Sequence, residues 1–162
     1  MLRHLLTRGL AVTAFDSDRK RLASLAADWP GKLRAAASLA ELVGCDTVIT
    51  MLPNSRETNQ VLAEGENPLI HVLRPDALVI DMGSSDPVET TRLAGLLNAA
   101  GIQLVDAPVS GSVAKAESGQ LSIMVGADSD LLERARPLLE VMGRIILPTG
   151  RVGSAHAMKA LN

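Results

Sequence analysis

Aromatic residues are almost absent from this sequence, which has one Phe, one Trp and no Tyr among 162 residues. Proteins that bind single-stranded nucleic acid stack the bases on aromatic side chains, and this chain has too few for such a platform. Sixteen Lys and Arg residues against eighteen Asp and Glu give a net charge of −2, with no basic run dense enough to neutralise a phosphate backbone. We therefore expect no nucleic-acid partner.

Cysteine is nearly absent as well, because Cys45 is the single example. One cysteine excludes an internal disulfide and any metal site built from several thiolates. The three histidines have no matched ligands at useful spacing, so we expect no metal. This composition is typical of a protein of the reducing cytoplasm.

Long hydrophobic runs are missing too. No segment approaches the roughly 18 consecutive apolar residues that a helix needs to cross a membrane. The apolar piece Leu10–Phe15 is too short for the centre of an export signal, and it continues into Asp16-Ser17-Asp18 instead of a small-residue cleavage site. We expect neither a membrane partner nor a cleaved leader.

The sequence does contain short β-branched runs that alternate with helical periodicity, the pattern of β-α-β units. Several of these runs are apolar on both faces, as a sheet covered on both sides requires. The pattern predicts an α/β fold with a doubly wound, mainly parallel sheet. We expect strands at 11–15, 33–35, 47–51, 77–81, 103–107, 121–125 and 144–147. We expect helices at 1–8, 18–27, 39–43, 55–62, 87–100 and 130–142, and a last one that begins after 150.

The helix at 87–100 has the clearest boundaries. Asp86 provides an N-cap, and Pro87 occupies the first helical position, where its missing N–H is not needed. Gly101 follows the last turn and favours a left-handed C-cap.

Asp16 follows the first predicted strand. At that position of a dinucleotide-binding unit, a carboxylate accepts hydrogen bonds from the ribose hydroxyls and repels a 2′-phosphate, which favours NAD over NADP. The alternative is that Asp16 or Asp18 simply caps the next helix. The glycine-rich turn G-x-G-x-x-G, which would hold a pyrophosphate, is not in the sequence.

Three further loops follow predicted strands, where ligands bind in open α/β sheets. The loops Met51–Asn54 and Met82–Ser85 could contact a cofactor, or they could serve only to cap the next helices. Ser110 and Gly111 lie in the third loop, within a stretch rich in small residues. A hydroxyl beside a glycine can form an anion-binding nest, although the same pair is also common in ordinary turns.

Lys159 and Asn162 lie three residues apart in the last predicted helix, so they share one face. A lysine in a partly desolvated cleft can exchange a proton with a substrate near neutral pH, and an asparagine beside it can orient either group. Most helical lysines are solvated surface charges, and that alternative stays open. His156 shares this face, one turn earlier.

Four motifs together resemble the β-hydroxyacid dehydrogenase family, the group that includes 3-hydroxyisobutyrate dehydrogenase and tartronate semialdehyde reductase. The motifs are DTVITMLP at 46–53, DMGSSDP at 81–87, DAPVSGSVAKAESGQLSIMVG at 106–126 and GRVGSAHAMKALN at 150–162. The resemblance covers essentially the whole chain. It implies a Rossmann-like fold and the use of NAD, with NADP as the alternative cofactor.

The resemblance also implies roles for individual residues. Ser110 and Gly111 correspond to the residues that bind the substrate carboxylate, and Lys159 to the lysine that interacts with the reacting hydroxyl. Asn162 corresponds to the asparagine that accompanies this lysine.

Four positions correspond to cofactor-contacting residues of the family. Leu52, Pro53 and Ser84 belong to the cofactor loops, and Asp16 matches the acidic choice at the ribose position.

The division of the chain follows from the same resemblance. We expect residues 1–150 to form a partial NAD(P)-binding domain and 151–162 to begin an interdomain helix, without the C-terminal helical domain. Met1 aligns with a position inside the family's first helix, so the fold is expected to be truncated at the N-terminus, without the first strand and its glycine turn. A homo-oligomer is also expected.

The implied activity is hydride transfer between a nicotinamide cofactor and a small 3-hydroxy acid, similar to 3-hydroxyisobutyrate, or its semialdehyde. Two alternatives stay open. One is an enzyme resembling 6-phosphogluconate dehydrogenase, which His156 favours. The other is a catalytically silent fragment of such a dehydrogenase.

Overall fold

A computed structural model describes residues 1–161. The helices are α1 (Leu2–Thr7), α2 (Arg19–Asp28), α3 (Ser55–Asn59), α4 (Pro87–Ala99), α5 (Val113–Glu117), α6 (Ser129–Met142) and α7 (Ser154–Leu161). The strands are β1 (Val12–Ala14), β2 (Leu33–Ala35), β3 (Thr47–Thr50), β4 (Leu78–Asp81), β5 (Gln103–Asp106), β6 (Val109–Ser110), β7 (Leu121–Gly126) and β8 (Gly143–Gly150). The short 3-10 helices η1 (Leu39–Leu42) and η3 (Leu69–His71) and the π-helical turn η2 (Gln60–Glu64) complete the order. Every predicted strand is present.

The strands form two sheets. Six of them have the order β3-β4-β5-β7-β6, with β8 paired to β7. The pairs β3–β4, β4–β5 and β7–β8 are parallel, and β7 meets β5 and β6 in antiparallel register. The α/β class and the mainly parallel sheet are therefore confirmed.

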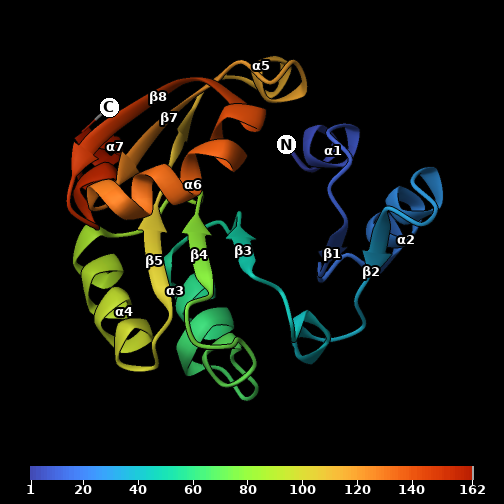
Figure 1. Ribbon diagram of the computed structural model, residues 1–162, viewed down its shortest axis with the longest axis horizontal. Coiled ribbons are helices and arrows are strands. Elements are labelled where there is room, and N and C mark those ends of the chain that lie inside the picture. Colours follow the sequence, from blue (N-terminus) through green and yellow to red (C-terminus); the bar gives the residue numbers. More distant parts are fainter. Residues whose placement is uncertain (162) are drawn as a thin grey trace.

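The remaining strands, β1 and β2, pair only with each other, in parallel. Figure 1 shows them with α2, set apart from the larger sheet. The strands of the fold are therefore divided between two sheets. Hydrophobic periodicity identifies a strand, but it does not show which other backbone comes within hydrogen-bonding distance. Here the Val12 N–H donates to Lys32 O and the Ala36 N–H to Ala14 O, so these bonds of β1 go to the β2 side.

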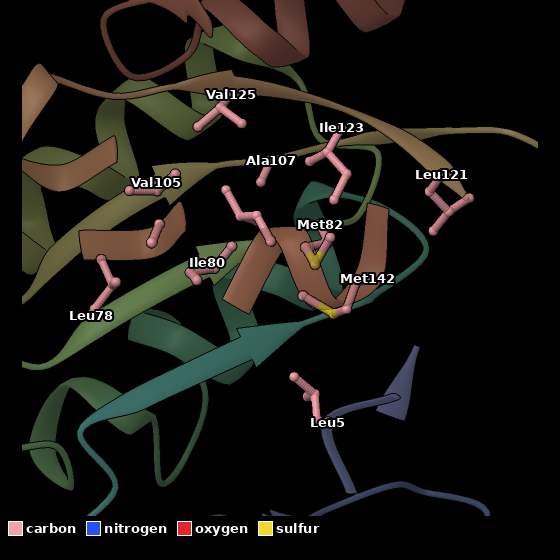
Figure 2. Close-up of a cluster of buried hydrophobic side chains, with 12 residues drawn as sticks. Leu5, Leu78, Ile80, Met82, Val105, Ala107, Leu121, Ile123, Val125 and Met142 are labelled. Atoms are coloured by element: carbon pink, nitrogen blue, oxygen red, sulfur yellow. The ribbon is translucent and has the colours of Figure 1, made fainter. Parts of the chain in front are cut away.

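The larger sheet is covered on both faces, because successive residues of its strands point to opposite sides. Leu78, Ile80 and Met82 belong to one buried cluster, which Ala135, Leu139 and Met142 of α6 complete. Figure 2 shows this cluster, with Leu5 of α1 approaching its edge. The second cluster takes the residues that point to the other face, Val79 of β4 and Ala77 just before it. Its further members include Ile102, Leu104, Leu93 and Leu97. This division is the doubly wound arrangement that the apolar strands predict.

Helix α4 begins and ends as predicted. The Asp86 carboxylate accepts hydrogen bonds from Val88 N, at 2.8 Å, and Glu89 N, at 3.2 Å. Gly101 has φ +77°, which closes the helix with paired bonds from Gly101 N to Asn98 O and from Ile102 N to Leu97 O.

The small-residue stretch 106–126 is more regular than a loop. It contains the two-residue strand β6 and the five-residue helix α5, neither of which the sequence pattern indicates. Ser112 caps α5 by accepting a hydrogen bond from Lys115 N. Helix α5 has no buried residue, so hydrophobic periodicity contains no sign of it.

None of the helices between residues 1 and 161 combines the length and apolarity that a bilayer-crossing segment needs.

Candidate functional site

Two buried aspartates stand at the carboxyl ends of neighbouring parallel strands. Asp81 ends β4 and Asp106 ends β5, and the sheet register pairs them directly. Their side chains lie at an edge where open α/β sheets bind ligands. Asp81 is 1% exposed and Asp106 is 0% exposed, so the charges they carry need partners inside the protein.

Asp81 organises the loop that follows β4. Its carboxylate accepts hydrogen bonds from the Thr50 hydroxyl at 2.9 Å, the Gly83 N–H at 3.1 Å and the Ser85 hydroxyl at 2.9 Å. These bonds fix the backbone on either side of Ser84, whose side chain is exposed. The loop that carries the predicted cofactor residue is therefore rigidly held.

The neighbouring loop after β3 lies against this one. A Cβ atom added to Gly83 would stand 2.5 Å from the Leu52 carbonyl oxygen, so only glycine permits this close approach. Leu52 is partly buried and Pro53 is exposed. The structure thus brings Leu52, Pro53 and Ser84 to one edge of the sheet, as predicted. Asn54 and Asp86 cap α3 and α4, which confirms the capping interpretation for those two residues.

Asp106 holds the start of α7. Its Oδ1 accepts a hydrogen bond from Gly153 N at 2.7 Å, and its Oδ2 accepts one from His156 N at 2.9 Å. Burial raises the pKa of the Asp106 carboxyl above its ordinary value, while these two N–H groups and His156 act in the opposite direction. The hydrogen bonds from Gly153 N and His156 N to the Asp106 carboxylate are charge-assisted, and they tie the start of α7 to the end of β5.

Lys159 lies on this same helix, one turn beyond His156. Its side chain is partly buried. Asn162, its predicted companion, lies outside the described residues.

Ser110 and Gly111 follow β5 by a few residues. Ser110 is partly buried on β6, opposite Ser122 of β7. Gly111 has φ +147°, and a Cβ atom there would lie 3.0 Å from Leu121 Cδ2, so the position strongly favours glycine. That Ser110 and Lys159 meet on one substrate stays a prediction.

Asp16 stands apart from these residues, at the end of β1 in the smaller sheet. Its Oδ1 accepts a hydrogen bond from Asp18 N at 2.9 Å. Asp18 is the N-cap of α2 and accepts from Arg21 N at 3.0 Å, so capping does not explain Asp16. The Asp16 carboxylate is exposed, which fits a group that meets ribose hydroxyls.

Arg19 is the positively charged residue of α2 that is nearest to Asp16 in the sequence, and its side chain is already hydrogen-bonded within the protein. The Arg19 guanidinium donates to Ala36 O and Ala37 O and lies 4.6 Å from the centre of the Phe15 ring. An arginine held in this way does not offer a free fork to a 2′-phosphate.

Two open hollows lie away from the predicted residues. One, of about 660 Å³, lies between the amino ends of α4 and α7 and includes Val88, Thr91, Val152 and Ala157. The other, of about 650 Å³, lies between the β1–β2 sheet and residues 41–45. Neither contains Ser84, Ser110 or Lys159.

Sequence reasoning gave no role to Asp81 and Asp106, which lie beneath the site, and it noted His156 without predicting its burial. A carboxylate that directly ends an otherwise apolar strand was the available signal in both aspartates. His156 is 1% exposed although its neighbour on the helix face, Lys159, is only partly buried. No sequence pattern predicts that difference.

Comparison with known proteins identifies the family. The sequence pattern that matches residues 1–152 is described as the NAD binding domain of 6-phosphogluconate dehydrogenase. The chain belongs to this family. This membership confirms the Rossmann-like fold and the expected cofactor class, and it agrees with the resemblance found from the motifs.

Relatives with named activities include dehydrogenases and reductases. The 3-hydroxyisobutyrate dehydrogenase of Pseudomonas aeruginosa is 34% identical over 162 residues, which are 100% of this chain and 53% of that protein. The NAD-dependent L-serine dehydrogenase of the same organism is 33% identical over the same length and share. The chain spans about half the length of these curated relatives.

A solved structure agrees with them. The 3-hydroxyisobutyrate dehydrogenase of Mycobacterium tuberculosis, solved with L-serine, superposes with a TM-score of 0.85 at 32% identity. The match covers 98% of this chain and 53% of that one.

Proposed function

We propose that this chain is the cofactor-binding part of an NAD-dependent oxidoreductase that acts on a small 3-hydroxy acid or its semialdehyde. Family membership supports the cofactor, and the named dehydrogenase relatives support the substrate class. The observation that carries the proposal is the bond pair from Asp106 to α7, because it ties the helix of Lys159 to the sheet edge where the Leu52 and Ser84 loops meet.

The residues of this chain would divide the chemistry between them. Ser110 and the backbone at Gly111 bind the substrate carboxylate and orient the carbinol carbon. Lys159, when neutral, accepts the hydroxyl proton during oxidation, and when protonated it returns the proton during reduction. The nicotinamide, when bound, supplies the hydride acceptor or donor. Asn162 orients the lysine or the substrate.

The cofactor contacts belong to the same proposal. Leu52, Pro53 and Ser84 would contact the cofactor, and Asp16 would accept from the adenosine ribose. Residues 1–150 act as the cofactor domain in this scheme, and 151–162 begin the helix that leads out of it. Assembly as a homo-oligomer in the cytoplasm completes the proposal.

A second candidate is a catalytically silent chain, which does not convert substrate by itself. The division into two sheets favours it, because Asp16 lies on one sheet and Lys159 is tied to the other. The alternative activity is that of a 6-phosphogluconate dehydrogenase, and the description of the family favours it.

Titration of the 162-residue protein with NAD and NADP, followed by calorimetry, tests the cofactor proposal. We expect NAD to bind more tightly than NADP. D16N should narrow this difference, because the amide keeps the hydrogen bond from Asp18 N but loses the charge that repels a 2′-phosphate. D28N removes a charge at the other end of α2 and serves as the matched control. A folded chain that binds neither nucleotide would overturn the proposal and favour the silent candidate.

A further inference from the structure

His156 is a buried histidine that the proposed chemistry does not use. Its side chain is enclosed between α7, α4 and the ends of two strands. Nδ1 lies 2.8 Å from the Thr90 hydroxyl oxygen and 3.8 Å from Asp106 Oδ2. Nε2 is buried, has no hydrogen-bond partner within residues 1–161, and lies 3.8 Å from Asp81 Oδ2. The imidazole therefore stands between the two aspartates that organise the site.

The Thr90 hydroxyl limits which nitrogens of the His156 ring can carry a proton. The Thr90 hydroxyl has a single proton and two neighbours, Asp86 O at 2.9 Å and His156 Nδ1 at 2.8 Å. If Thr90 donates to Nδ1, a neutral ring carries its proton on Nε2. If Thr90 donates to Asp86 O, then Nδ1 must carry a proton and donate to Thr90.

In the second case a neutral ring would direct its Nε2 lone pair at the Asp81 carboxylate, which is electrostatically unfavourable in a buried site. An imidazolium, with protons on both nitrogens, avoids this repulsion and faces one carboxylate from β4 and one from β5. Both favourable arrangements therefore place a proton on Nε2, the ring nitrogen that lies 3.8 Å from Asp81 Oδ2.

We propose that His156 and Asp106 are positioning residues that hold Lys159 in a fixed place relative to the Ser84 loop. Asp106 binds the backbone of the first turn of α7, and His156 joins that turn to Thr90 on α4 and faces Asp81. Asp81 is also the acceptor that shapes the loop around Ser84. One buried network thus contacts both halves of the site, and Lys159 follows His156 by a single helical turn.

This inference rests on the proposed function, which makes Lys159 the proton-handling group. Its test uses NMR of the 162-residue protein without cofactor or turnover, so it can fail or succeed independently of the NAD titration. Long-range proton–nitrogen spectra report which ring nitrogens of His156 carry protons. The ε-methylene signal of Lys159 and the amide signal of Ser84 report on the two halves of the site.

The decisive variants are T90V and T91V. Both remove one hydroxyl from α4 with little change of shape, but within residues 1–161 the Thr91 hydroxyl donates to Pro87 O and has no hydrogen bond to His156. We expect T90V to shift the His156 ring, Lys159 and Ser84 signals together, and T91V to leave all three unchanged. T90S keeps the hydroxyl and should return the signals to those of the wild type.

Two results would overturn the inference. One is a wild-type His156 with no proton on Nε2, a measurement that does not depend on any variant folding. The other is a folded T90V protein whose His156 ring signals shift while those of Lys159 and Ser84 do not, since that would show a purely local structural role.

Discussion

Asp106 shows how strongly a single residue can depend on its surroundings. Its carboxylate is removed from water, which penalises the charge, yet one oxygen accepts from the N–H of Gly153, just before α7, and the other from the N–H of His156 in α7. The cross-strand neighbour of Asp106 is Gly126, and a side chain there would overlap the carboxylate. Glycine at 126 is therefore required by the aspartate opposite, not by a turn.

G126A tests this dependence. The new methyl group would displace the Asp106 carboxylate, and we expect a loss of about 1–3 kcal/mol in the free energy of unfolding, as for other overpacked cores. Urea denaturation followed by circular dichroism measures the change.

The same substitution in a D106A background provides the control. The aspartate side chain is then absent, so the alanine at 126 has space and its penalty should be much smaller. Equal penalties in the two backgrounds would show that Gly126 is needed for another reason.

At the scale of elements, α4 illustrates how local chemistry sets boundaries. Asp86 and Pro87 start the helix and Gly101 ends it, and each acts on backbone groups a few residues away. Such signals do not require the rest of the fold, which explains why the predicted limits agree with the observed ones. By contrast, β6 exists only because β7 lies beside it.

G101A and G95A form a matched pair on this helix. Gly101 has φ +77°, so alanine there should lower the free energy of unfolding by about 1–2 kcal/mol, the cost of a left-handed backbone. Gly95 lies inside α4, with open space where a Cβ would stand, and alanine there should stabilise the protein by about 0.5–1 kcal/mol. Thermal unfolding of both variants measures these effects. Midpoint temperatures that shift in the same direction in the two variants would contradict this account.

At the scale of the whole molecule, stability depends on groups buried between layers. The two hydrophobic clusters cover opposite faces of the larger sheet, and the polar network of Asp81, Asp106 and His156 lies at its carboxyl edge. The clusters stabilise the fold by burying apolar side chains, an effect that does not depend on particular pairs of residues. Asp106 adds a dependence on pH, because burial raises the pKa of its carboxyl above the ordinary value.

The pH dependence of unfolding should therefore contain a contribution from Asp106. Burial raises the pKa of this carboxyl in the folded state above the unfolded value of about 3.9. The folded protein then binds the proton more tightly, so the contribution of Asp106 to stability is complete below the unfolded pKa and is lost as the pH rises through the folded pKa.

D106N cannot titrate and serves as the reference. We expect the stability of the wild type relative to D106N to fall as the pH increases from about 4, where the unfolded carboxyl begins to ionise. Urea unfolding of both proteins across this range measures the difference. A difference that stays constant, or that increases with pH, would show that the N–H bonds and His156 outweigh the effect of burial.

The sequence by itself determined most elements of this protein, with β6 and α5 as exceptions. Strands such as β4 and β5 are apolar on both faces, and capping residues fix the ends of α4, so short-range patterns were sufficient for the α/β class. Motifs also sufficed to indicate the family and to nominate Ser84, Ser110 and Lys159, since these depend on residue order alone.

Only the tertiary structure decided how these parts meet. The separation of β1 and β2 from the larger sheet, the burial of His156 and the two bonds from Asp106 to α7 all join residues far apart in the chain. Such pairings depend on which backbones and side chains the packing brings within hydrogen-bonding distance. Periodicity and spacing describe each segment separately, so they contain no information on that distance.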